Sequence, residues 1–252
     1  MIPWFQWSVI HIGPLPVQVW GSFVALGMVV SLLIVTRRSE RFHLPREQML
    51  DLALWAIIGG LIGSRVFHVL FYQPSFFLAQ PLEIIKIWHG GLSSFGGLFG
   101  AMVGFALFVK RKAIPKFQFF IIADLMSFAA VFGWIVGRLG CFMIHDHLGV
   151  HSTCPLAIQT PTGPRLEMAL VEILGMIPLA ILFFYFRRKQ MREGWYTGML
   201  FVYYGILRCI LDFFRATDIR GADSRYIGLT PGQYFAIVMA AVGGYFLYKK
   251  GE

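Results

Sequence analysis

The densest group of reactive side chains in this sequence lies between residues 137 and 149. This stretch carries Arg138, Cys141, His145, Asp146 and His147. An imidazole titrates near neutral pH and can take a proton from a thiol or hydroxyl nucleophile. A guanidinium stays charged and can hold a phosphate through two donors. The stretch therefore predicts proton transfer beside an anion-binding group, with His145, His147 and Asp146 as candidate catalytic residues.

The same residue types also allow a metal site or a disulfide. His151 and Cys154 follow the two histidines closely, but their spacing matches no standard zinc-ligand pattern, so no metal and no cofactor is expected. Cys141 and Cys154 could form a disulfide. Two other interpretations of Cys141, a nucleophile or an inert core residue, stay equally open.

Ionisable residues also interrupt long apolar runs, at Arg65, Asp124, Arg138, Glu172, Arg208 and Asp212. Each costs at least about 2.5 kcal/mol to insert into a membrane, so each needs a partner or a function. Arg208 and Asp212 are spaced i,i+4 and must share a helix face. Together with Arg65 and Arg138 they predict a pocket for an anionic lipid. A purely structural Arg208–Asp212 pair is the alternative, and Asp124 is expected to be structural.

The elements that must position these groups are apolar helices. Hydrophobic residues make up 57% of the chain and charged residues only 14%, against about 25% charged in average soluble proteins. This imbalance predicts an all-α integral membrane protein forming a single transmembrane domain over residues 1–252. Apolar runs of about 20 residues predict seven spans, at residues 17–35, 52–71, 92–109, 117–136, 168–186, 196–214 and 233–248.

The net charge of +9 is concentrated in short clusters. Of the 22 Lys and Arg residues, 14 lie near residues 37–46, 110–116, 187–192 and 249–250, after the first, third, fifth and seventh runs. This is the positive-inside pattern of membrane proteins and not a nucleic-acid groove. It predicts an N-terminus outside, a C-terminus in the cytoplasm, and extracytoplasmic segments at 72–91 and 137–167.

Glycine spacing and one amphipathic stretch complete the pattern. Gly59, Gly60 and Gly63 in the second run, and Gly96, Gly97 and Gly100 in the third, predict close helix packing. A re-entrant edge at residues 90–97 is the alternative. Residues 81–89 are typical of a short interfacial helix.

The motifs resemble those of a known family. Gly137, Arg138, Gly140, Phe142 and Gly149 fill places of the motif G-R-x-G-N-F-x-N-x-E-x-x-G of the prolipoprotein diacylglyceryl transferases of bacterial inner membranes. Similar stretches occur at residues 20–21, 63–72, 88–98 and 208–215. The resemblance covers nearly the whole chain.

This resemblance implies transfer of a diacylglyceryl group from phosphatidylglycerol to the lipobox cysteine thiol of a preprolipoprotein. The site would face the outer half of the bacterial inner membrane, with a thioether formed and glycerol phosphate released. Arg138 would bind the phospholipid head group and Arg208 would stabilise charge on the leaving phosphate. The further substrate-binding candidates are Gly137, Gly140, Cys141, Arg65, Trp20, Ser93, Asp212 and Glu172.

The sequence departs from the family pattern at the residues of greatest chemical interest. Two motif asparagines, the motif glutamate and a family histidine are replaced by Cys141, Ile144, Asp146 and Phe95. Because the usual family base is absent, we hypothesise that His145 or His147 replaces it. The alternatives are a related transferase with another acceptor, and a non-catalytic lipid-binding or transport protein that keeps the arginine pocket.

Overall fold

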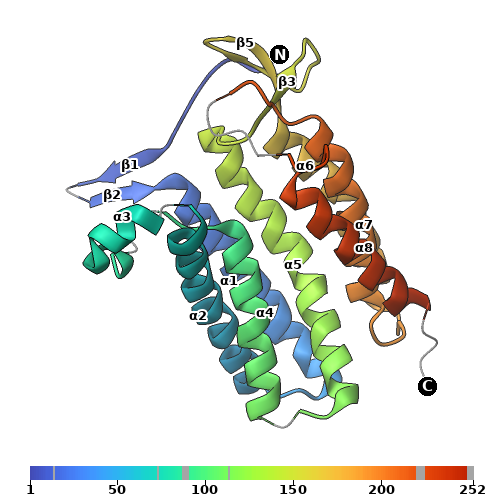
Figure 1. The fold of residues 1–252 in the computed structure, drawn as a ribbon. Helices are drawn as coiled ribbons and strands as arrows, with labels where there is room; N and C mark the ends of the chain where they lie inside the picture. Colours follow the sequence, from blue (N-terminus) through green and yellow to red (C-terminus); the bar gives the residue numbers. More distant parts are fainter. Residues whose placement is uncertain (14, 73, 87–90, 113, 220–224, 249–252) are drawn as a thin grey trace. The chain divides into compact units, whose positions relative to one another are not determined.

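The computed structural model of the chain is mostly helical and describes all residues except 14, 73, 87–90, 113, 220–224 and 249–252 (Figure 1). The chain forms two compact units. The first combines Met1–Val35 with Phe120–Glu252, and the second is Thr36–Phe119. Helices α1 (Val19–Ser39) and α5 (Lys116–Ile144) contribute residues to both units.

The first unit contains most of α1 and α5, and also α6 (Met168–Phe186), α7 (Trp195–Phe213) and α8 (Pro231–Tyr248). Strands β1 (Val9–Ile12) and β2 (Leu15–Gln18) form an antiparallel hairpin before α1. Strands β3 (Leu148–His151), β4 (Ala157–Thr160) and β5 (Gly163–Glu167) form an antiparallel sheet in the order β3-β5-β4. This sheet fills the connection between α5 and α6.

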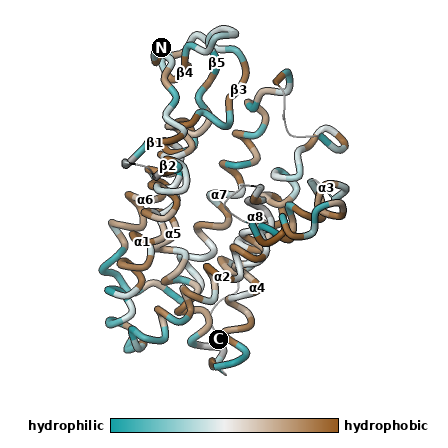
Figure 2. The backbone as a smooth tube through the Cα atoms, turned by 90° about the vertical axis from the view of Figure 1, so that its left-hand side faces the viewer, coloured by the Kyte–Doolittle hydropathy of each residue, from teal (hydrophilic) through white to brown (hydrophobic). Residues whose placement is uncertain are grey.

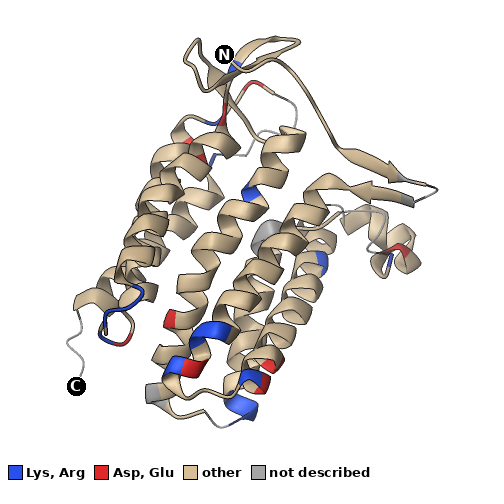
Figure 3. Ribbon diagram, turned by 180° about the vertical axis from the view of Figure 1, so that it is seen from behind, with Lys and Arg blue, Asp and Glu red and all other residues tan. Residues whose placement is uncertain are grey.

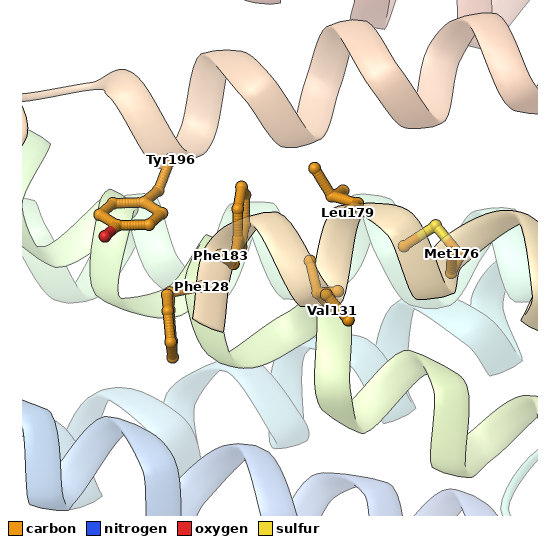
Figure 4. Close-up of a cluster of buried hydrophobic side chains, with 7 residues drawn as sticks. Phe128, Val131, Met176, Leu179, Phe183 and Tyr196 are labelled. Atoms are coloured by element: carbon orange, nitrogen blue, oxygen red, sulfur yellow. The ribbon is translucent and has the colours of Figure 1, made fainter. Parts of the chain in front are cut away.

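An aromatic core holds α5, α6 and α7 together. Figure 4 shows the buried side chains that meet there: Phe128, Val131, Met176, Leu179, Phe183 and Tyr196. The rings of Phe128 and Phe183 stack with centroids 5.9 Å apart, and Tyr196 meets both rings edge-on. Such pairs add geometric preference to the packing. This core therefore fixes how the polar faces of α5, α6 and α7 meet elsewhere along the three helices.

Asp124 of α5 caps the beginning of α7. Its Oδ1 accepts hydrogen bonds from the backbone N–H of Thr197 at 2.9 Å and from the Thr197 hydroxyl at 2.8 Å. The first N–H groups of a helix lack intrahelical partners, so a carboxylate from a neighbouring helix can satisfy them. These contacts give Asp124 a structural role.

The second unit is built on α2 (Arg46–Phe71) and α4 (Ser94–Arg111), which lie side by side (Figure 1). The shorter elements are the 3-10 helices η1 (Glu40–Phe42) and η2 (Pro81–Ile84), with α3 (Pro74–Ala79) between α2 and η2. Glycines allow the close approach: a Cβ at Gly100 would collide with the carbonyl oxygen of Gly59, and one at Gly63 would lie 2.7 Å from the Gly100 Cα. The glycine pattern predicted close helix packing, and the structure shows that α4 is the partner of α2.

The α2–α4 contact gives a direct stability prediction. We expect Gly100→Ala to destabilise the protein by about 1–3 kcal/mol, because the added methyl group forces two helix backbones apart. A Cβ at Gly97 would meet the Ser64 side chain at 3.6 Å and the Gly60 carbonyl oxygen at 3.7 Å, which are ordinary contacts, so Gly97→Ala is the matched control. Thermal unfolding in detergent compares the two variants. Equal unfolding midpoints would contradict the glycine contact.

Among the described residues, four helical segments are long and apolar enough to cross a membrane: Val19–Phe42, Arg46–Phe71, Gln118–Ile144 and Met168–Phe186. The long helices are largely hydrophobic along their length (Figure 2). Lys and Arg gather mostly near helix ends (Figure 3). A mostly helical membrane protein is therefore confirmed.

The structure differs from the sequence prediction in two elements. The fourth predicted span ends at residue 136, but α5 continues to Ile144, so Gly137, Arg138, Gly140 and Cys141 are helical. A carboxylate on α6 pairs with Arg138, and this ion pair stabilises the helical conformation beyond residue 136. The three-stranded sheet was also not predicted, since its strands are only four or five residues long. Of the interfacial helix predicted at 81–89, η2 forms one turn, and residues 87–89 lie outside the described residues.

Candidate functional site: an arginine pocket

Glu172 of α6 is the centre of a polar network in the first unit. Its buried carboxylate accepts two charge-assisted hydrogen bonds from Arg138 of α5, from Nε to Oε1 at 3.0 Å and from a terminal guanidinium nitrogen to Oε2 at 2.8 Å. Arg208 of α7 donates to Oε2 at 3.3 Å. This two-point contact fixes the plane of the Arg138 guanidinium. One carboxylate thus ties three helices together.

Two aromatic residues complete the environment of Glu172. The Trp134 indole N–H donates to Oε1 at 2.8 Å and the Tyr204 hydroxyl at 3.2 Å, with the two rings edge-on at 5.4 Å. Neither Trp134 nor Tyr204 was among the predicted site residues. Trp134 precedes Arg138 by four positions and Tyr204 precedes Arg208 by four, so each shares a helix face with its arginine. That four-residue spacing was the sequence signal from which both aromatic residues could have been found.

Asp212 of α7 forms a second acidic centre next to the first. A terminal nitrogen of Arg208 lies 3.0 Å from Oδ1, which confirms that these i,i+4 residues share a face. Arg215 lies 3.8 Å from the same oxygen. The Thr230 hydroxyl donates to Oδ2 at 2.5 Å. Arg208 therefore bridges the two buried acids.

A pocket opens among these groups, lined by Arg138, His147, Met168, Ala169, Glu172, Arg208, Leu211, Asp212 and Arg215. Three arginines and two carboxylates leave one net positive charge. A singly charged phosphodiester would match that charge.

His147 is the predicted base candidate that lines the pocket. Its Nε2 lies 3.5 Å from Oδ2 of Asp146. Burial and the positive charges of Arg215, Arg138 and Arg208 lower the pKa of His147 to about 3. Burial also raises the pKa of Asp146, against the opposing effect of Arg138. His147 is thus neutral at physiological pH and keeps a lone pair for a proton.

The lowered pKa of His147 predicts a pH effect on stability. Because the folded pKa lies near 3 and the unfolded one near 6.5, the unfolded state binds the proton first as pH falls. The contribution is present above about pH 6.5 and is lost progressively toward pH 3. Because 41% of the His147 side chain is exposed, solvent screens part of this effect. Thermal unfolding between pH 7 and 4 should therefore show a slightly steeper loss in wild type than in His147→Gln.

The matched control for this measurement is His11→Gln, at an exposed position of β1. That substitution should leave the wild-type slope against pH unchanged. Parallel slopes for wild type and His147→Gln would contradict the arginine-rich environment assigned to His147.

His145 does not line this pocket. It ends α5 with its imidazole fully buried, and its Nδ1 lies 2.7 Å from Oε2 of Glu167. The Sγ of Cys141 accepts a hydrogen bond from Arg138 at 3.5 Å. Cys141 and Cys154 are both free thiols in the structure. Of the predicted cluster, Arg138 and His147 therefore reach the pocket and His145 points to another partner.

The helical glycines of the motif lie close to this arrangement. A Cβ at Gly140 would lie 2.8 Å from the Phe23 Cβ and 3.2 Å from the Trp20 backbone, so Gly140 lets α1 approach α5. A Cβ at Gly137 would meet nothing within 4 Å. Trp20 thus contributes its backbone to helix packing, and its side chain is not among the pocket-lining groups.

Two further predicted residues belong to the second unit. Arg65 is buried and donates to four backbone carbonyls, those of Glu83, Ile84, Lys86 and Gly91. Ser93 caps α4 by accepting a hydrogen bond from the Gly96 N–H at 3.3 Å. Arg65 thus holds η2 together with Lys86 and Gly91, and Ser93 caps the start of α4. The side chain of Phe95, at the position of the family histidine, is not among those described.

Apolar helices surrounding a buried arginine–carboxylate pocket define a helical membrane protein with a positively charged pocket. The sequence model of the prolipoprotein diacylglyceryl transferase family matches residues 8–249. The chain belongs to that family and is a transferase.

Individual relatives agree over most of the chain. A phosphatidylglycerol–prolipoprotein diacylglyceryl transferase from Polynucleobacter necessarius is 32% identical over 97% of this chain and 95% of its own length. Proteins of the same name from Pseudomonas paraeruginosa and Anaplasma marginale are 31% and 29% identical, over 92% and 94% of this chain and 88% and 85% of their own lengths.

Proposed function

We propose that this protein transfers the diacylglyceryl group of phosphatidylglycerol to the lipobox cysteine thiol of preprolipoproteins. The pocket around Glu172 is the observation that carries the proposal. It combines three arginines with two carboxylates and so has one net positive charge, which complements a phosphodiester. In this proposal Arg138 binds the phosphate through its fixed guanidinium plane.

The reaction forms one bond and breaks one. The cysteine sulfur attacks the glyceryl carbon that carries the phosphate, a C–S thioether bond forms, and the C–O bond to the phosphate breaks. The leaving group is glycerol phosphate, on which negative charge increases as the bond breaks. Arg208 lies between Glu172 and Asp212 and would stabilise that charge.

The thiol proton needs an acceptor, and we assign it to His147. Its imidazole is neutral and lines the pocket. An arriving phosphate would offset the field of Arg138, Arg208 and Arg215, and would thereby raise the pKa of His147 toward its usual range. Substrate binding would thus make His147 a stronger base. Asp146 would interact with the resulting imidazolium.

The finer topology is part of the same proposal. Helices α4, α7 and α8 contain 18, 19 and 18 residues and correspond to three further predicted spans. With the four segments named above they would give seven spans in one transmembrane domain, with the N-terminus outside and the C-terminus in the cytoplasm. Residues 72–91 and 137–167 would lie outside the cytoplasm. The pocket would face the outer half of the bacterial inner membrane.

Complementation tests the activity directly. The protein is expressed in a bacterium depleted of its own transferase, and the mass of a model lipoprotein is measured. We expect the mass of one diacylglyceryl group to be added. A lipoprotein without this mass shift, in cells where the protein is folded and inserted, would overturn the proposal.

Purified components then separate donor from acceptor. Detergent-solubilised protein is given a lipobox peptide with vesicles of phosphatidylglycerol or of phosphatidylethanolamine. Transfer is expected only from phosphatidylglycerol and only to a peptide that carries the cysteine. Transfer to another acceptor would point to a related reaction with a different substrate.

A further inference from the structure

The C-terminal end of α5 is joined to the beginning of α6 by a buried pair of side chains, His145 and Glu167. Both side chains are fully buried, and Nδ1 of His145 lies 2.7 Å from Oε2 of Glu167. The other carboxylate oxygen, Oε1, accepts a hydrogen bond from the Ala169 N–H and so caps α6. Glu167 thus binds the end of one helix and the start of the next.

Aromatic rings enclose the imidazole. The centroid of the His145 ring lies 4.6 Å from that of Phe5, 5.1 Å from Trp4 and 5.6 Å from Phe142. Its Nε2 is buried and has no hydrogen-bond partner among the described residues. Glu167 is therefore the polar group that orients this ring.

His145 has a left-handed backbone conformation, with φ of 51°. Histidine, asparagine and aspartate adopt this geometry more often than other residues with a side chain. The buried Nε2 without a hydrogen-bond partner among the described residues lowers stability. Stability alone therefore does not account for the pair.

His145 directly follows α5, and its N–H still donates to the Cys141 carbonyl oxygen. On α5 itself, Trp134, Arg138 and Cys141 follow one another at spacings of four and three residues, which places them on one face of the helix. This end of α5 is joined to α6 twice, through Arg138 to Glu172 and through His145 to Glu167. These two contacts are two helical turns apart, so they fix the rotation of α5 about its own axis and its position along α6.

We propose that the His145–Glu167 pair is a positioning device that sets the guanidinium of Arg138 against Glu172 for binding the substrate phosphate. The proposal rests on the function proposed above and adds a residue pair that acts through Arg138 without touching the substrate. Without the second contact, rotation of the α5 end would move Arg138 in the pocket. A misplacement of about 1 Å can cost up to 100-fold in rate.

Substitutions at residue 145 separate position from stability. His145→Gly removes the imidazole and leaves the buried Glu167 carboxylate without that partner, so its unfolding midpoint should fall. Among the folded molecules, kcat/KM for phosphatidylglycerol should fall about tenfold, with the KM for the lipobox peptide unchanged. His145→Asn tolerates the same backbone and places an amide N–H near the position of Nδ1. It should keep kcat/KM within about threefold of wild type.

A double variant tests whether His145 acts through Arg138. If His145 acts through Arg138, then His145→Gly should reduce activity no further in an Arg138→Gln background. Equal kcat/KM for wild type and His145→Gly would overturn the proposal. So would a loss in His145→Asn as large as that in His145→Gly, or fully additive losses in the double variant.

The failure of the proposed function would be recognised separately. In that case wild type itself transfers no diacylglyceryl group, and the affinity of the variants for phosphatidylglycerol in nanodiscs becomes the measurement. Weaker binding by His145→Gly than by wild type, restored in His145→Asn, would still support positioning of Arg138. Unchanged binding in His145→Gly would exclude it.

Discussion

Arg138→Gln is expected to reduce diacylglyceryl transfer by at least about 100-fold, the loss typical when a charge-stabilising donor is removed from an active site. Arg138 supplies a guanidinium whose plane is fixed by two hydrogen bonds to Glu172. Glutamine keeps some hydrogen-bonding capacity but has no charge to attract a phosphate. Transfer to a lipobox peptide, normalised to folded protein, measures the loss.

Two further arginine variants show whether the effect is specific. Arg138→Lys keeps the charge but loses the planar two-point contact, so it should retain more activity than Arg138→Gln and less than wild type. Arg188→Gln removes an exposed arginine just after α6 and should leave transfer unchanged. Near wild-type activity in Arg138→Gln would remove this residue from the site.

Glu172→Ala is expected to destabilise the protein by about 3–5 kcal/mol, because removal of one partner leaves buried charge uncompensated. Two arginines and two aromatic donors meet at this carboxylate, and only Asp212 would remain to balance Arg208. The unfolding midpoint in detergent and the amount of folded protein in membranes should both fall.

The matched control is Glu193→Ala, which removes an exposed glutamate between α6 and α7. Such surface substitutions usually change stability by less than about 0.5 kcal/mol. Adding Arg138→Gln to Glu172→Ala should recover part of the stability, because Arg138 is ion-paired with Glu172 and its unbalanced charge disappears with it. A Glu172→Ala variant as stable as Glu193→Ala would contradict the central role of this carboxylate.

The sequence was most informative where one physical rule dominates. Hydrophobic runs predicted the helices, and the glycines predicted close helix packing but not which helices pack together. The end of α5 was misjudged because Gly137 and Arg138 are typical of a helix end in lipid. In the folded chain Arg138 pairs with Glu172, 34 residues later in the sequence. Local patterns carry no information about such a distant partner.

The site could be predicted in part for the same reason. Arg208 and Asp212 were paired correctly because i,i+4 spacing alone places them together. Arg138 and Arg208 meet only through Glu172, which lies on a third helix. The two histidines of the motif looked equivalent in sequence. Left-handed geometry at His145 turns the chain between them, so that His145 meets Glu167 and His147 reaches the pocket.

The carboxylates of Glu172 and Asp212 have a further consequence for turnover. In the proposed reaction the donor lipid carries one negative charge, whereas a released phosphate monoester carries about −1.5 to −2 at neutral pH. Three arginines without acidic neighbours would retain that product more tightly than they bind the donor. Because the two acids neutralise part of the arginines' positive charge, they weaken the binding of the product and shorten its residence time. A site that held the phosphate with all of its charge would be slow to empty for the next lipid.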